Sequence, residues 1–260
     1  PPVEEQRRIA DFLDDQVAQI DSLQSTHQLG VKLSDEAFTS WLETRTAGAP
    51  RVPMRRLTDS ITSGPRGWGD LVSDSGQRMF MRINNISASG IDPNLGNVAW
   101  VSPSDDAESR RAQLVVGDLL VSITASIGDV AVVDESVAGA AFSQHVARVR
   151  LKSPPEARAI AWAASAREPR ERLRSMSFGG TKVGLGLQDV LSWEIPVVAR
   201  SQADLFVREV EDHFQHHEAL ADAHLAALQL LEERKRAVIT AAVTGELDVT
   251  TARPIGVEKW

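Results

Sequence analysis

The sequence has 260 residues, of which 42% are hydrophobic and 25% are charged. This composition is typical of a folded globular chain and excludes a low-complexity disordered one. Cysteine is absent, which excludes disulfide scaffolds, thiolate zinc sites and cysteine nucleophiles. A net charge of −8 argues, taken alone, against a general polyanion binder, because such binding depends on neutralising phosphates with Lys and Arg.

The charge is distributed unevenly along the chain. Residues 1–50 carry 4 basic and 9 acidic side chains, residues 51–195 carry 17 and 16, and residues 196–260 carry 7 and 11. The acidity therefore lies at both ends, and the near-neutral middle, whose cations are mostly Arg, can present a positive face. An evenly mixed surface fits the same counts equally well.

The sequence carries no membrane or export signal. No run of about 18 apolar residues occurs, so we expect no membrane contact. The first residues lack the apolar core of a signal peptide, and we therefore expect a cytoplasmic protein. The chain begins with Pro1 instead of Met, which indicates a processed product or a piece of a longer chain.

Apolar residues at steps of three and four predict a first long helix over about residues 4–44. Gly30 is a weak point in this helix, because glycine costs about 1 kcal/mol of helix propensity. Gly48 and Pro50 are expected to end it. The stripe that we expect to face a partner helix begins with Ile9, Leu13, Val17, Ile20 and Leu23.

Residues 51–195 show a different pattern, in which short apolar runs alternate with turn residues. The runs predict strands near residues 79–83, 98–101, 114–123, 130–133 and 146–151. Residues 155–176 are rich in Ala and in Arg/Glu pairs and predict a helix. A glycine-rich loop follows at residues 179–186. We expect a mostly β domain of the α+β class.

A second long helix is predicted from residue 201 to residue 244, which contains no Pro or Gly, with Gly245 as its stop. Two long helices with matching stripes in one chain predict an antiparallel coiled-coil pair. We expect a long helix at residues 1–48, a middle domain at 49–196, a second helix at 197–246 and a tail at 247–260. The stripe of the second helix includes Phe206, Val210, Leu228, Leu231 and Val238.

The sequence contains no recognisable catalytic or metal-binding motif. The glycine-rich loop lacks the Gly-Lys-Ser/Thr ending of a phosphate-binding loop, and His-Glu-x-x-His and Gly-x-Ser-x-Gly are absent. The Asn/Asp-Pro-Pro-Tyr/Phe type of motif that an adenine methyltransferase needs is absent as well. His217 and His224 are interpreted as tolerated interface positions and not as metal ligands. Paired carboxylates that meet only in space stay open.

Several segments resemble one known family. The run PPVEEQRRI at residues 1–9 is similar to the Pro-Pro-x-x-Glu-Gln-x-x-Ile helix that ends a target recognition domain in the specificity subunits of type I restriction-modification systems. The run LEERKRAVITAAVTGELD at residues 231–248 resembles the second such helix. The middle segments RINNI (82–86), GDLLVS (117–122), IG (127–128), GT (180–181) and LGL (185–187) resemble recurrent elements of the recognition domain.

The likeness also has departures. The first helix ends without the Ala-Val-Thr-Gly form, and Arg200-Ser201-Gln202 stands where Glu-Gln would precede the second helix. The family usually carries two recognition domains, whereas one domain lies between two helices here. The sequence therefore fits either a half-length subunit or a fragment of a two-domain subunit.

The resemblance implies a non-catalytic subunit of a complex that methylates and restricts DNA as part of phage defence. The recognition domain would read half of a bipartite sequence in double-stranded DNA, and the helices would act as a spacer and bind methyltransferase subunits and a restriction subunit. S-adenosylmethionine, ATP and Mg²⁺ are expected on those partner subunits and not on this chain. A homodimer, or a recognition domain on a partner chain, would supply the second recognition domain that the family usually has.

Polar side chains in the middle domain are the candidate DNA contacts, because phosphate contacts fix register and polar groups read base edges. We expect them in loops, where Arg66 offers a guanidinium to guanine or phosphate and Lys182 an ammonium to phosphate. The full set is Arg66, Trp68, Arg82, Asn84, Asn85, Thr124, Ser126, Gln144, His145, Gly180, Thr181 and Lys182.

Two other classes of function remain as alternatives. A coiled-coil scaffold or regulatory protein would bind protein through its middle domain and would be insensitive to DNA and salt. A hydrolase with acids assembled in space would show turnover without partners.

Overall fold

The computed structural model describes residues 2–86, 90–177 and 184–247. The chain divides into two units, residues 1–37 with 215–260, and residues 38–214. All of the predicted tail at residues 247–260 except Leu247 lies outside the described residues, as do the predicted contacts Gly180, Thr181 and Lys182. None of the helices in the described ranges is both long enough and apolar enough to cross a membrane.

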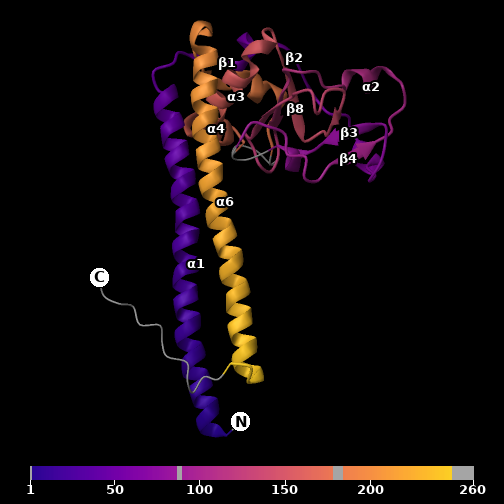
Figure 1. Ribbon diagram of the computed structural model, residues 1–260. Coiled ribbons are helices and arrows are strands. Elements are labelled where there is room, and N and C mark those ends of the chain that lie inside the picture. The colour runs from indigo at the N-terminus through magenta and orange to yellow at the C-terminus, as the bar shows by residue number, and fades with distance from the viewer. Residues whose placement is uncertain (1, 87–89, 178–183, 248–260) are drawn as a thin grey trace. The chain divides into compact units, whose positions relative to one another are not determined.

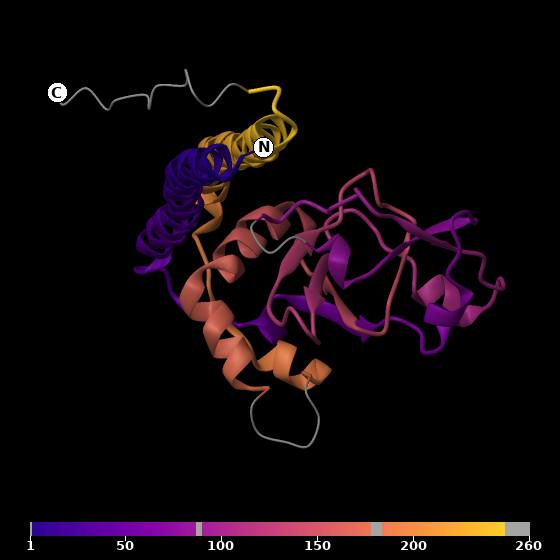
Figure 2. The same cartoon turned by 90° about the horizontal axis from the view of Figure 1, so that it is seen from below.

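The first unit consists of most of two long helices, α1 (Val3–Thr46) and α6 (Arg200–Thr244). They lie side by side and run in opposite directions, as Figures 1 and 2 both show. Contacts confirm the direction, because Ser34 meets His217 while Asp21, nearer the N-terminus, meets Lys235. The predicted helices and their antiparallel pairing are confirmed, with bounds that differ from the prediction by only one or two residues.

Leu23 is a correction to the predicted contact stripe. Its side chain is 48% exposed, whereas Ile20 is buried at 3% and Gln24 is half-buried. The buried and half-buried positions on α1 here are 20, 24 and 27, so the position in contact with α6 is Gln24, one residue after the predicted Leu23. Gln24 stands in the seam because a coiled-coil repeat of 3.5 residues alternates steps of three and four.

The second unit is built around two sheets. The larger has strand order β2–β8–β5–β6, and every neighbouring pair in it is antiparallel. The smaller has the order β4–β3–β7, with β3 and β7 parallel. Their strands are β2 (Thr58–Ser63), β3 (Arg78–Met81), β4 (Ala99–Val101), β5 (Leu119–Ser122), β6 (Val130–Val132), β7 (Ala141–Phe142) and β8 (Val146–Leu151).

Each face of the larger sheet is covered by its own apolar core. Along β5, Leu119 and Val121 belong to one core and Leu120 to the other, as the two-residue alternation of a strand requires. The first core includes α3 (Ala157–Ser165) and α4 (Arg167–Ser175), and the second includes the smaller sheet. This explains why the strand at β5 reads as a continuous apolar run in the sequence.

A short two-stranded ladder lies where the chain leaves α1 and where it returns to α6. Strand β1 (Arg51–Pro53) pairs antiparallel with β9 (Glu194–Pro196), although 140 residues separate them in the sequence. Next to it, Phe38 of α1 and Phe214 of α6 pack on Trp162 of α3, with ring centroids 5.1–6.0 Å apart. These contacts hold the domain ends of both long helices to α3.

The predicted helix at residues 155–176 is divided into separate elements. The 3-10 turn at Pro154–Glu156 precedes α3, and α3 ends because Ala166 adopts an extended ψ of 154° before α4 begins. The sequence patterns did not predict β1, β2, β7 or β9, nor the short helices α2 (Ala107–Arg111) and α5 (Leu187–Ser192). The missed strands read RVP, TDSITS, AF and EIP, which are too short or too polar to stand out as apolar runs.

Candidate nucleic-acid interface

An open cavity of about 610 Å³ lies between three segments of the second unit. Its inner wall is apolar and includes Phe80, which is 1% exposed, together with Ile86. Four of the predicted DNA contacts line it: Arg82, Asn84, Ser126 and His145. They come from the turn after β3, the loop between β5 and β6, and the turn between β7 and β8. The fold therefore gathers on one cavity side chains that are up to 63 residues apart.

The turn after β3 separates two adjacent asparagines. Asn85 is 1% exposed, its Oδ1 accepts a hydrogen bond from the Arg82 backbone N–H at 2.9 Å, and its Nδ2 donates to the carbonyls of Asn94 and Asn97 at 2.9 and 3.0 Å. Asn84 is exposed beside the cavity. Asn85 therefore holds the turn together and is not kept among the proposed DNA contacts, whereas Asn84 presents its amide to solvent.

Arg82 is held beside Asn84 by the same turn. Its Nη2 lies 3.4 Å from the carbonyl oxygen of Asn97 and 3.3 Å from the Asn97 Oδ1. Its Nε is buried and has no hydrogen-bond partner among the described residues. The guanidinium is thus oriented by weak contacts and keeps donor capacity, which suits a group that exchanges partners when a ligand binds.

The loop from Ser122 to Asp129 forms a second wall and is closed by backbone hydrogen bonds. The N–H of Ser122 donates to Asp129 at 2.9 Å, and the N–H of Gly128 donates back to Ser122 at 3.1 Å. At the tip, Ala125 adopts a positive φ of 53°, which side chains other than glycine rarely take. The loop presents exposed Ser126 and half-buried Thr124 from a fixed frame.

A buried carboxylate lies under this loop beside two arginines. Oδ1 of Asp129 is 3.9 Å from Nη1 of Arg170 and 3.6 Å from Nη2 of Arg174. Burial raises the pKa of Asp129, and both arginines oppose that rise. Burial also lowers the pKa of Arg170, which Asp129 partly offsets. Two cations against one acid leave this end of the domain locally positive, which favours an anionic ligand.

The third wall is the turn between β7 and β8. The Ser143 Oγ accepts a hydrogen bond from the His145 N–H at 3.1 Å, and the His145 carbonyl accepts from Ile123 at 3.1 Å. The side chains of Gln144 and His145 are exposed. The turn is therefore anchored to the Ser122–Asp129 loop through its backbone, and at the surface the Gln144 Nε2 lies 3.4 Å from the His145 Nε2.

The remaining predicted contacts have different surroundings. Trp68 is only 7% exposed and belongs to the second core, so it is not kept as a DNA contact. Arg66 is exposed on a turn whose Gly64 packs so tightly that a Cβ there would come within 2.0 Å of the Phe142 carbonyl oxygen. Arg66 does not line the cavity, but its turn is fixed against β7, the strand that precedes the His145 turn.

The sequence did not point to Ala125, Asp129, Arg170 or Arg174 as residues of the site. The two arginines lie in the segment 155–176, whose Arg/Glu pairs predicted only a helix. No sequence signal indicates that residues 129 and 174 meet. Within the described ranges, no three histidine or acidic side chains gather closely enough to hold a metal ion.

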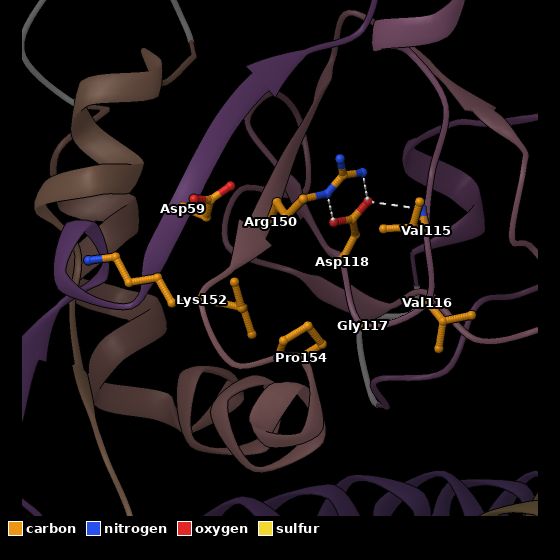
Figure 3. Close-up of a pocket in the computed structure, with 9 residues that line it drawn as sticks. Asp59, Val115, Val116, Gly117, Asp118, Arg150, Lys152 and Pro154 are labelled. Atoms are coloured by element: carbon orange, nitrogen blue, oxygen red, sulfur yellow. Dashed lines mark hydrogen bonds and ion pairs between the residues drawn. The ribbon is translucent and has the colours of Figure 1, made fainter.

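A second, smaller cavity of about 300 Å³ lies at the other end of β8. Arg150 there points at Asp118 and donates two hydrogen bonds to its carboxylate, at 2.9 and 2.8 Å (Figure 3). Asp118 is 1% exposed and also accepts from the Val115 N–H at 3.0 Å. The hydrogen bond to Asp118 raises the pKa of Arg150. None of the predicted DNA contacts lines this cavity, in which Arg150 and Asp118 are paired with each other.

No protein-family model matches the sequence, and no curated protein matches it. Solved structures do match over nearly the whole chain. A chain from a structure of complex assembly and conformational transition in the type I restriction-modification system has a TM-score of 0.72 and 18% identity, covering 95% of this chain and 61% of that one. The HsdS subunit from Thermoanaerobacter tengcongensis has a TM-score of 0.56 and 18% identity, covering 95% and 60%.

This chain has the fold of a type I restriction-modification S subunit. The S subunit from M. genitalium is also similar, with a TM-score of 0.46, 11% identity and coverage of 93% of this chain and 61% of that one. The predicted α+β class, with long helices flanking a β-rich domain, is confirmed. The chain spans 60–61% of the length of the S-subunit structures that it matches.

Proposed function

We propose that this chain is a specificity subunit of a type I restriction-modification system, and that its second unit reads one half of a bipartite DNA target. The observation that carries the proposal is the convergence of Arg82, Asn84, Ser126 and His145 on one cavity of a domain with the S-subunit fold. An arginine guanidinium or an asparagine amide can pair with the edge of a purine, and a serine hydroxyl can pair with any base.

The local charge supports DNA as the ligand. Arg170 and Arg174 outnumber Asp129 beneath the cavity. Arg66 and the sequence-predicted Lys182 would add phosphate contacts, which set position on the duplex without reading sequence. Phosphate contacts and base contacts can be distinguished, because only the former change the dependence of affinity on salt.

The two long helices would bind the methyltransferase subunits, and the chain itself would be non-catalytic. S-adenosylmethionine, ATP and Mg²⁺ would be bound by the partner subunits. The acidic balance of both helices and their exposed leucines, which include Leu29, Leu33, Leu220 and Leu230, supports a protein partner there.

The test is to assemble the chain with a type I methyltransferase subunit and to measure DNA binding over a salt series. We expect sequence-dependent binding. Asn84→Ala should lower the ratio of specific to non-specific affinity roughly 5- to 150-fold, which corresponds to about 1–3 kcal/mol for a bidentate base contact. Arg66→Ala should weaken binding to all sequences and make the salt dependence shallower.

A matched control is Arg110→Ala, which removes an exposed arginine of α2 whose side chain pairs with exposed Asp105. It should leave both affinity and the salt dependence unchanged. If the assembled complex binds no DNA and the methyltransferase subunit still co-purifies, the scaffold alternative replaces the proposal. Turnover by the isolated chain would instead favour a hydrolase.

A further inference from the structure

The helix pair in the first unit has a coiled-coil seam. Along each helix, a series of buried and half-buried residues alternates steps of four and three, as a heptad repeat requires, and Phe12, Gln16 and Gly30 flank this series on α1. The seam residues are Leu13, Val17, Ile20, Gln24, His27, Val31 and Ser34 on α1, and His217, Ala221, His224, Leu228, Leu231, Lys235, Val238 and Ala242 on α6.

Two layers of this seam, which also holds Gln24 and Lys235, contain histidine. The Ser34 Oγ lies 2.9 Å from the His217 Nδ1, and the His217 Nε2 lies 3.3 Å from the Asp35 Oδ1. Ser34 and His217 are only 6% and 9% exposed. One heptad away, the Nδ1 atoms of His27 and His224 lie 2.9 Å apart across the pair. Each of these three imidazoles therefore has a polar partner on the opposite helix.

The second layer also depends on the small size of Gly30. Gly30, one turn from His27, leaves room for the His224 ring, because a Cβ at Gly30 would come within 2.5 Å of its Cε1 and Nε2. Any other residue at position 30 would require the ring to move. The glycine that weakens the helix locally is thus the residue that lets His224 reach His27.

We infer that these two layers, with the notch at Gly30, specify the register of the antiparallel helix pair. A shift by one heptad in one direction would place His224 opposite Ile20, and a shift in the other would place His27 opposite Leu231. Either shift buries an imidazole against an aliphatic side chain, which is costly when its hydrogen bond is lost. Within the first unit, the aliphatic layers of the seam repeat every seven residues, so they do not by themselves distinguish these three registers.

One consequence of the inference rests on the proposed function: if the helix pair is a spacer between two recognition domains, its register sets the distance between them. Four residues act as positioning residues: His27, Ser34, His217 and His224. Ion pairs at the surface, such as Lys235 with Asp21 at 2.6 Å, add to the same register but are half-exposed and screened by salt.

The test uses the absence of cysteine in the chain. Ala10→Cys and Ala226→Cys place nitroxide labels at exposed positions on α1 and α6, and double electron–electron resonance measures their separation in the whole chain. One narrow distance is expected with the native seam. Replacing all four positioning residues by leucine should add a population displaced along the axis by about 10 Å, seven residues at 1.5 Å each.

A matched control separates register from stability. Leu228→Ala weakens the apolar seam but keeps both polar layers, so it should lower the melting temperature and keep the single distance. Gly30→Ala improves helix propensity but fills the notch, and should broaden the distance distribution. A single unchanged distance in the four-leucine variant would overturn the inference. The measurement needs neither DNA nor a methyltransferase subunit, so its result is independent of the proposed function.

Discussion

The backbone N–H of Leu185 donates a 2.8 Å hydrogen bond to the carbonyl oxygen of Ile123. A Cβ on neighbouring Gly184 would lie 3.3 Å from the Thr124 Cγ2, so the two segments are in close contact. The described end of the glycine-rich segment is therefore tied to the loop that lines the candidate DNA-binding cavity. A substitution that moves the Ser122–Asp129 loop should therefore also move Gly184 and Leu185.

Ala125 offers a direct test of the conformation of this loop. Its left-handed backbone costs an alanine about 1–2 kcal/mol, so Ala125→Gly should relieve that strain. The greater freedom of glycine in the unfolded chain offsets about 0.4–1 kcal/mol of the gain. Urea unfolding should show Ala125→Gly to be equal in stability or up to about 1.6 kcal/mol more stable.

Ala125→Val should instead destabilise the chain, because a β-branched residue fits a positive φ worst. A valine variant as stable as the native chain would show that the loop does not hold this conformation in solution.

The neighbouring asparagines should respond in opposite ways to alanine. Asn85→Ala leaves three backbone groups without their partner in a buried turn, so it should lower the free energy of unfolding by about 1–3 kcal/mol. Asn84→Ala removes an exposed amide and should change stability by less than about 0.5 kcal/mol. Denaturant unfolding of the two variants side by side measures the difference, and equal losses would contradict the assignment.

Asp129 should make stability depend on pH. Its pKa is raised in the folded chain, so the folded state binds more protons than the unfolded state between 3.8, the ordinary value, and the raised pKa. The contribution of Asp129 to the free energy of unfolding is therefore lost as pH rises from 3.8 through the raised pKa. Asp129→Asn removes this titration.

The measurement is urea unfolding of the native chain and Asp129→Asn at several pH values from about 4 to 7. The difference in unfolding free energy should move in favour of the variant as pH rises, whatever its offset from the lost contacts with Arg170 and Arg174. A difference that is constant with pH, or that moves toward the native chain, would show that the two arginines outweigh burial.

The Asp118–Arg150 pair should stabilise the second unit without affecting DNA binding (Figure 3). Arg150→Leu leaves the Asp118 carboxylate buried with one remaining partner, the Val115 N–H. Because the Arg150 side chain is 33% exposed, we expect a loss of about 1–3 kcal/mol, below that for a fully buried pair. Thermal unfolding measures the loss, and DNA affinity of the folded variant should equal that of the native chain.

The sequence by itself determined the helices and the class of the fold. Periods of three and four residues are read from neighbours in the chain, so α1 and α6 could be placed within one or two residues. Matching stripes predicted their antiparallel pairing, and turn residues separated the main strands of the middle domain. Arg82, Asn84, Ser126 and His145 could be named as candidates because polar residues in loops are available to a ligand.

Only the tertiary structure decided which candidates share a cavity and which support the fold. Asn84 and Asn85 are chemically identical in the sequence, and the carbonyls of Asn94 and Asn97 determine that Asn85 is the buried one. Gly30 counts as a defect until His224 is placed against it. The physical reason is the same in each case: local propensity depends on adjacent residues, whereas burial, hydrogen bonding and steric fit depend on partners far away in the chain.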